Sequence, residues 1–146
     1  MNAVKDYIPH REPFLFVDSI VEMDADHIVT RFELKPELDF FRGHYPENPL
    51  MPGVLMCEAV FQTAGILMAS KQNETDPAGN TEGIASTPIL TKITNARFRR
   101  MALPGDVLTI EVKPESTQGN FHMMRGKVSH ADGSAIMSVD FTITLK

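Results

Sequence analysis

The sequence predicts an α+β fold in which an antiparallel β-sheet wraps around one long helix. The stretch 53–71 contains no proline and is apolar on nearly every side, which is typical of a buried core helix. Apolar and polar residues alternate at 108–112 and again at 137–145, with the period of half-buried strands. One core helix and several alternating segments therefore make up the expected architecture.

The segments before the helix are expected to form one antiparallel pair of strands. A short helix or turn opens the chain up to Ile8. The strands are predicted at 14–23 and 28–34, and the turn between them at 24–26, where the sequence reads Asp-Ala-Asp.

The segments after the helix are expected to form a meander of antiparallel strands. The stretch 72–83 is polar and predicts a surface excursion with no chemistry of its own. The sequences Thr-Gln-Gly-Asn at 117–120 and Ala-Asp-Gly-Ser at 131–134 predict hairpin turns. Neither a repeat nor a second domain is indicated, so 1–146 is expected to be one domain.

Three prolines stiffen the loop that precedes the helix. Pro46, Pro49 and Pro52 each fix φ at about −65° and lack a backbone N–H, so the loop can join neither a strand nor a helix. The imidazole of His44 is therefore expected to be held in place. An imidazole that is neutral at physiological pH can act as a base.

Glu58 is a carboxylic acid inside the apolar helix. Apolar surroundings disfavour the charged form, so Glu58 is expected to keep a proton near neutral pH and to deliver it as an acid. Gln62 follows at i+4 on the same helix face and can hydrogen-bond to the acid. A buried glutamate that Gln62 merely satisfies, without any chemistry, is the alternative interpretation.

Charge and hydropathy narrow the classes of function. The 146 residues include 14 basic and 19 acidic side chains, and the net charge of −5 argues against general nucleic-acid binding. No stretch approaches the roughly 18 uninterrupted apolar residues of a membrane span, and no basic, hydrophobic leader opens the chain. We therefore expect no membrane insertion and a cytoplasmic location.

Metal, cofactor and thiol chemistry are not indicated by the sequence. No metal-site spacing links the histidines, which are His10, His27, His44, His122 and His130. Glycine-rich phosphate loops and the nucleophile motif of serine hydrolases are absent from the sequence. Cys57 is the only cysteine and is expected to be an inert core residue. The chemistry is therefore expected to use side chains alone, with neither metal nor cofactor.

Four short motifs are spread over almost the whole chain. They are Ile8-Pro-His-Arg-Glu-Pro-Phe-Leu-Phe-Val-Asp18, Phe40-Phe-Arg-Gly-His-Tyr-Pro46, Met51-Pro-Gly-Val-Leu55 with Glu58 and Gln62, and Asn95-Ala-Arg-Phe-Arg-Arg100 with Pro104-Gly-Asp106. In this order they resemble the β-hydroxyacyl-acyl carrier protein dehydratases of bacterial type II fatty-acid synthesis, the FabZ type.

The resemblance implies a hotdog fold and at least a homodimer, with tunnel-shaped sites at the subunit interface. Whether the dimers assemble further into a hexamer, as a trimer of dimers, stays open. It implies His44 and Glu58 as the catalytic pair, with His44 of one subunit facing Glu58 of the other. It also implies that the Gly53 N–H polarises the thioester carbonyl and that the Val54 N–H helps hold the departing water. Isomerising relatives carry Asp where this chain has Glu58, so a plain dehydratase is expected.

The expected reaction is dehydration of a (3R)-hydroxyacyl-acyl carrier protein to the trans-2-enoyl product in fatty-acid biosynthesis. The carbon next to the thioester carbonyl is acidic, so His44 suits the base and Glu58 the acid at the leaving hydroxyl. The first N–H groups of a helix have no intrahelical partner, so Gly53 can stabilise an enolate oxygen. A mechanism in which His44 carries both proton transfers and Glu58 only positions hydroxyl or water stays open.

Three other functions also stay open. A hotdog thioesterase would need Glu58 and a bound water, but it would leave the stiff His44 loop unexplained. A non-catalytic carrier-binding or scaffold subunit is expected to have lost His44 or Glu58, and both are present. The same dehydration in a specialised polyene or lipid pathway is the third.

Arg97, Arg99 and Arg100 form the one dense basic cluster of an acidic protein. Strand alternation would put Arg97 and Arg99 on one face, and Phe98 and Arg100 on the other. Acyl carrier proteins are strongly acidic, so we predict that the cluster docks this partner. A solvated strand face without a partner is the alternative.

One segment departs from the family pattern. Many relatives have a Tyr-Phe pair just before the Asn-Ala-Arg strand, and its Tyr gates the tunnel. This chain has Ser86-Thr-Pro-Ile-Leu90 instead, which leaves gating and acyl chain-length preference open.

Overall fold

A computed structural model describes residues 3–75 and 87–145 of the chain. The described elements, in chain order, are the 3-10 helix η1 (Val4–Asp6), β1 (Ser19–Asp24), β2 (His27–Glu33), α1 (Phe40–Gly43), α2 (Gly53–Thr75), β3 (Pro88–Phe98), β4 (Val107–Gln118), β5 (Phe121–His130) and β6 (Ala135–Leu145). The expected α+β composition is confirmed.

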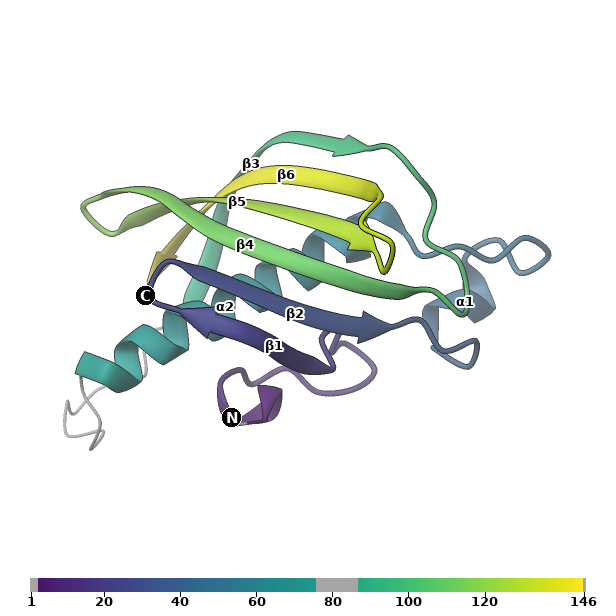
Figure 1. Ribbon diagram of the computed structural model, residues 1–146, viewed down its shortest axis with the longest axis horizontal. Coiled ribbons are helices and arrows are strands. Elements are labelled where there is room, and N and C mark those ends of the chain that lie inside the picture. Colours follow the sequence, from purple (N-terminus) through teal and green to yellow (C-terminus); the bar gives the residue numbers. More distant parts are fainter. Residues whose placement is uncertain (1–2, 76–86, 146) are drawn as a thin grey trace.

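The strands form a single antiparallel sheet in the order β1-β2-β4-β5-β6-β3. The sheet curves over α2, which runs along its inner face (Figure 1). The chain passes through α2 between β2 and β3, so β3 pairs with β6 at the far edge instead of with β2. The predicted turns lie at the ends of the β1–β2, β4–β5 and β5–β6 hairpins, and the meander is confirmed.

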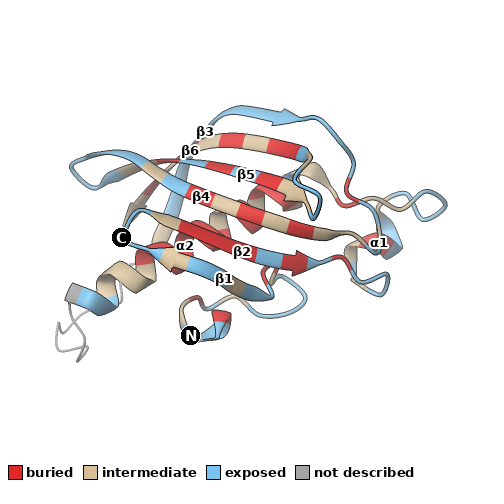
Figure 2. Ribbon diagram, viewed as in Figure 1, coloured by how far each residue is buried: buried red, intermediate tan, exposed pale blue. Residues whose placement is uncertain are grey.

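The core lies between α2 and the inner face of the sheet, and β2, β4, β5 and β6 all carry buried residues of this core (Figure 2). The stretch Gly53–Glu74 is long and apolar enough to cross a membrane by length and composition alone, but 61% of its apolar 18-residue window is buried inside the protein. A core helix passes the same test, and here α2 packs against β4, β2, β3 and β5. It is therefore the core helix that the sequence predicts.

The helix approaches the sheet most closely at Gly126 of β5. A Cβ on Gly126 would lie only 2.2 Å from Cγ1 of Val60, a distance that real side chains do not adopt. Val60 is fully buried and packs directly on the backbone of β5. Gly126 is therefore required by the distance between helix and sheet.

Three predicted boundaries differ from the structure. The strand expected at 14–23 begins only at Ser19, because the backbone groups of Phe14 and Phe16 bond to the Gln62 side chain instead of to a strand. The helix expected at 53–71 continues to Thr75. The polar excursion expected at 72–83 thus begins inside α2, and its remainder from 76 lies outside the described residues.

Gly126→Ala is expected to destabilise the fold by about 1–3 kcal/mol or more, because the added methyl overlaps Val60. Urea unfolding would measure the loss. Gly43→Ala is the control, since a Cβ there meets no atom within 4 Å. The double variant with Val60→Ala should lose less stability than the two single losses add up to. Additive losses would contradict a direct clash.

Candidate active site

His44 follows directly after α1, and its ring is fixed by a main-chain acceptor. Its backbone N–H donates to the Phe40 carbonyl over 3.0 Å, which closes the last turn of α1. Its Nδ1 lies 2.9 Å from the Leu50 carbonyl oxygen. A carbonyl can only accept, so Nδ1 carries the proton and Nε2 keeps its lone pair. In the neutral ring, Nε2 is therefore the atom with the lone pair that could accept a proton.

The proline-rich loop after His44 is tied at both of its ends. Tyr45 adopts a positive φ of 55°, and its carbonyl accepts the Asn48 N–H over 2.8 Å in a tight turn. Met51 is fully buried and donates its N–H to the Ala102 carbonyl over 2.8 Å. These bonds, together with the prolines, hold the loop between α1 and α2 in the way the sequence predicts.

The start of α2 presents backbone donors. The Pro52 carbonyl accepts the N–H groups of Leu55 and Met56, so it is the first acceptor of the helix. The N–H groups of Gly53 and Val54 come before the first bonded amide and have no intrahelical acceptor. A Cβ on Gly53 would lie 2.9 Å from Cε1 of Phe98, so glycine permits the close packing of β3 on the helix start.

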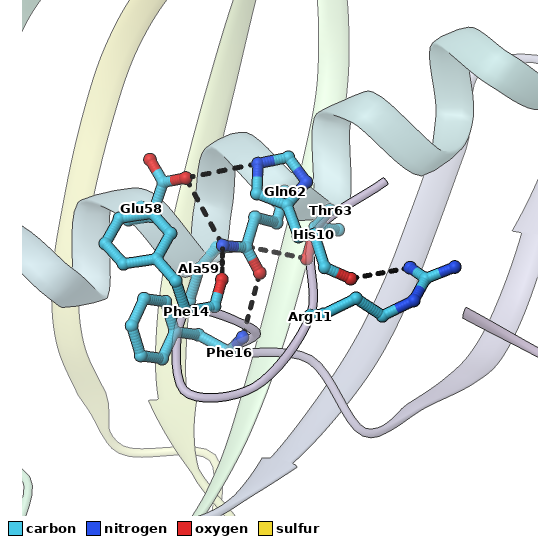
Figure 3. Close-up of polar contacts among 8 residues, drawn as sticks. All are labelled: His10, Arg11, Phe14, Phe16, Glu58, Ala59, Gln62 and Thr63. Atoms are coloured by element: carbon cyan, nitrogen blue, oxygen red, sulfur yellow. Dashed lines mark hydrogen bonds and ion pairs between the residues drawn. The ribbon is translucent and has the colours of Figure 1, made fainter. Parts of the chain in front are cut away.

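Glu58 lies on α2 beside Gln62, as the spacing predicts (Figure 3). Gln62 is buried, and its Oε1 accepts the Phe16 N–H over 2.8 Å, which fixes the orientation of the amide. The two Nε2 protons then reach the Phe14 carbonyl over 3.0 Å and Oε1 of Glu58 over 3.2 Å. Gln62 thus joins the acid to the segment before β1.

The Glu58 side chain is less buried than its position in an apolar helix suggests. It is 23% exposed, and nearby Val54 is 75% exposed, so this face of α2 is not covered by the sheet. It opens into a pocket of about 230 Å³. The lining is largely apolar: Ile8, Phe61, Gly65, Pro88, Ile89, Leu90 and Ile143 surround His10, Glu58 and Gln62. The Glu58 carboxyl group therefore faces a largely apolar groove.

The segment that departs from the family pattern contributes to this groove. Pro88, Ile89 and Leu90 lie at the start of β3 and line the pocket beside Glu58. Ser86 lies outside the described residues. Aliphatic side chains therefore occupy the wall at this point.

His10 is a site residue that sequence reasoning missed. Its Nε2 lies 3.6 Å from Oε1 of Glu58, on the same oxygen that Gln62 contacts (Figure 3). The sequence contained a signal, because His10 is part of the first of the four motifs. The contact joins a segment before β1 to a helix far along the chain, so no local spacing reveals it.

His44 and Glu58 do not meet within one chain. Across residues 3–75 and 87–145, no hydrogen bond or ion pair links them, and His44 does not line the pocket at Glu58. Within one chain, the His44 imidazole and the Glu58 carboxyl group therefore lie in separate places.

The arginine cluster lies at the end of β3, next to the start of α2. All three side chains are exposed, and Phe98, which packs on Gly53, lies between Arg97 and Arg99 in the chain. The strand ends at Phe98, so the predicted alternation does not extend to Arg99 and Arg100. Nη1 of Arg100 donates to the Ala135 carbonyl over 2.7 Å and ties this segment to β6.

Cys57 is buried in α2, and this burial raises the pKa of its thiol. A protonated thiol is a poor nucleophile, which agrees with an inert core residue. Within the described ranges, no group of three or more His, Cys, Asp or Glu side chains could hold a metal ion.

A curved antiparallel sheet around one long central helix is the arrangement of the hotdog fold. Residues 8–140 match the family model described as a FabA-like domain. The chain therefore belongs to the FabA-like family, and the expected hotdog fold is confirmed.

The comparisons with individual proteins agree with this family. The chain is 36% identical over 144 residues to a 3-hydroxyacyl-(acyl-carrier-protein) dehydratase FabZ of Coxiella burnetii, covering 98% of this chain and 97% of the relative. The dehydratase heterocomplex ApeI:P of Xenorhabdus doucetiae superposes with a TM-score of 0.82 at 16% identity, covering 100% of this chain and 92% of that one. A hypothetical thioesterase of Streptococcus pneumoniae with coenzyme A superposes with a TM-score of 0.65 at 15% identity, covering 88% of this chain and 84% of that one.

Proposed function

We propose that this protein is a 3-hydroxyacyl-acyl carrier protein dehydratase that removes water from a (3R)-hydroxyacyl thioester in fatty-acid biosynthesis, in the cytoplasm. The observation that carries the proposal is the 36% identity to a FabZ dehydratase over 98% of the chain. The chain also contains both His44 and Glu58. The geometry of each residue suits its part in an elimination.

His44 is the base. With Nδ1–H bonded to the Leu50 carbonyl, Nε2 has a free lone pair and can take the proton from the carbon next to the thioester carbonyl. The electrons move toward the carbonyl oxygen, and the Gly53 N–H at the start of α2 stabilises the developing charge. The prolines and the hydrogen bond from the Met51 N–H to the Ala102 carbonyl hold the loop, and with it the His44 ring, in place during this step.

Glu58 is the acid. The bond from C3 to the hydroxyl breaks as Glu58 gives its proton to the leaving oxygen, and a trans-2-enoyl thioester and water result. The Val54 N–H helps to hold the water. Gln62 fixes the carboxyl group, and the apolar walls of the pocket receive the acyl chain.

The complete site requires a second subunit, and we infer a homodimer as the smallest active form. Strand β3 is an edge strand and nearly every residue on it is exposed. Its apolar residues Ile89, Leu90, Ile93 and Phe98 are 39–50% exposed in one chain. An unpaired apolar edge favours association with another strand, and a partner there would bring a second His44 loop toward Glu58. Assembly of dimers into a hexamer is compatible with this arrangement.

A thioesterase is the second candidate, since the hypothetical thioesterase of Streptococcus pneumoniae shares the fold. At 15% identity this likeness shows the fold alone. A thioesterase would also leave the fixed tautomer of His44 without a use. Incubation with a (3R)-hydroxyacyl-carrier protein distinguishes the two, because the dehydratase yields an enoyl product by absorbance or mass and the thioesterase a free acid. Service in a specialised polyene or lipid pathway would involve the same chemistry.

His44→Ala and Glu58→Gln are each expected to lower the rate of dehydration roughly 100- to 10,000-fold or more, because each removes one partner in proton transfer. Enoyl formation would measure the loss, and size-exclusion chromatography would check that the oligomer persists. Cys57→Ser is a helix control that touches no proposed role. An active His44→Ala variant, in either direction of the reaction, would rule out the base proposed here.

Mixing the two inactive variants is expected to restore activity if the pair is shared between subunits. A hybrid dimer has one doubly damaged site and one intact site. Equal amounts exchanged at random give hybrids in half of the dimers and recover roughly a quarter of wild-type activity. Verified exchange without recovery would mean that both residues act within one chain.

Reversing two charges of the arginine cluster is expected to slow turnover of carrier-protein substrates. We infer that Arg97 and Arg99 attract the acidic carrier protein to the site, so Arg97→Glu with Arg99→Glu should lower kcat/KM roughly 10-fold or more, with a strong dependence on salt. A short coenzyme A or pantetheine thioester should be nearly unaffected. Arg31→Glu, an exposed charge on β2, is the control. Equal loss on both substrates would mean that the arginines support the fold or tunnel.

A further inference from the structure

His10 contacts the proposed acid, yet the dehydration described above gives it no part. Its segment is fixed on α2: Ile8 is buried, and its Cγ2 lies 3.4 Å from where a Cβ of Gly65 would stand. Arg11 binds the same segment, with Nη1 donating to the carbonyls of Ile8 and His10 and Nη2 to that of Lys5. The ring of His10 is thus carried by an ordered segment.

The surroundings of the ring favour one tautomer. Nδ1 of His10 is buried and is the one buried side-chain nitrogen or oxygen of the described residues without a hydrogen-bond partner. A proton on Nδ1 would be a buried donor without an acceptor, which is costly, whereas a bare lone pair there costs less. The tautomer with its proton on Nε2 is therefore favoured, and Nε2 is the atom that faces Glu58.

Two N–H donors then converge on one oxygen of the acid. Gln62 donates to Oε1 of Glu58 over 3.2 Å, and Nε2 of His10 lies 3.6 Å from the same atom. The second distance is slightly longer than a hydrogen bond. Among residues 3–75 and 87–145, Oε2 has no hydrogen bond. A proton on Oε1 would compete with both donors, whereas a proton on Oε2 would not.

We propose that His10 is a positioning residue: its Nε2–H and that of Gln62 hold Oε1 of Glu58, so that Oε2 carries the proton delivered to the leaving hydroxyl. The inference rests on the proposed dehydration and specifies which oxygen of the acid reacts. His10 neither gives nor takes a proton in the reaction. It fixes the rotation of the carboxyl group about its last bond.

A pair of substitutions separates the donor of His10 from its volume. The amide nitrogen of glutamine can reach the place of Nε2, whereas that of asparagine reaches only the place of Nδ1. His10→Asn is expected to lower kcat about 10- to 100-fold at nearly unchanged KM, the size of effect that misplacement of a reacting group produces. His10→Gln should restore most of that loss. Substituting His130, whose Nδ1 lies 3.7 Å from Asp106, by the same two residues is the matched control.

The kcat values and unfolding midpoints of the His10 variants distinguish a positioning role of His10 from a purely structural one. Equal loss of kcat in both His10 variants, with lower unfolding midpoints, would make His10 a structural residue and overturn the proposal. Wild-type kcat in His10→Asn would also overturn it.

A second measurement needs no turnover. Nitrogen-15 NMR of histidine-labelled protein at pH 7, with the His10 signals identified by their absence in His10→Gln, should show a neutral ring protonated at Nε2 that shifts in Glu58→Gln. A charged ring, or a proton on Nδ1, would contradict the proposal. Failure of the wild type to dehydrate any 3-hydroxyacyl thioester would instead refute the proposed function, and the ring state would still test the contact between His10 and Glu58.

Discussion

The close approach of α2 to the sheet is the constraint on which the other features depend. At Gly126 the helix packs on bare backbone, and Val60 fills the space that a side chain would take. This contact fixes how deep the helix lies, and α2 carries Gly53, Glu58 and Gln62. A core packed at this density transmits a small change in one layer to the next. The positions of the acid and of the free helix N–H groups are therefore set by packing in the core.

Gln62 connects this core to the polar part of the site. It lies in the buried helix, but its amide completes the hydrogen bonds of a chain segment that has no strand partner at that point. Its remaining N–H reaches the acid. The same side chain thus holds the entry to β1 and orients Glu58, so loss of its amide would disturb the fold and the site together. A buried amide is suited to this because its donors and acceptor cannot be exchanged once one of them is fixed.

Local patterns predicted the elements, and contacts distant in sequence decided what the patterns missed. The core helix, the hairpin turns and the pairing of Glu58 with Gln62 follow from periodicity and spacing within a few residues. The predicted start of β1 was wrong because the acceptor for the Phe16 N–H is a side chain 46 residues away. The tautomer of His44 depends on the Leu50 carbonyl, and the role of His10 on its position against α2; neither is readable without coordinates. The short helix α1 spans only four residues and leaves no periodic pattern.

The exposed edge of the sheet and the pocket share residues, which couples association to the formation of the site. Ile89 and Leu90 are about 40% exposed on β3 and also line the groove beside Glu58. A second chain that covered this edge would remove their apolar surface from water and would close the groove along the same side. The groove would then become drier, and an acid and an imidazole exert stronger electrostatic effects where water is excluded. The free energy that favours association would therefore also build the environment that acid-base chemistry needs.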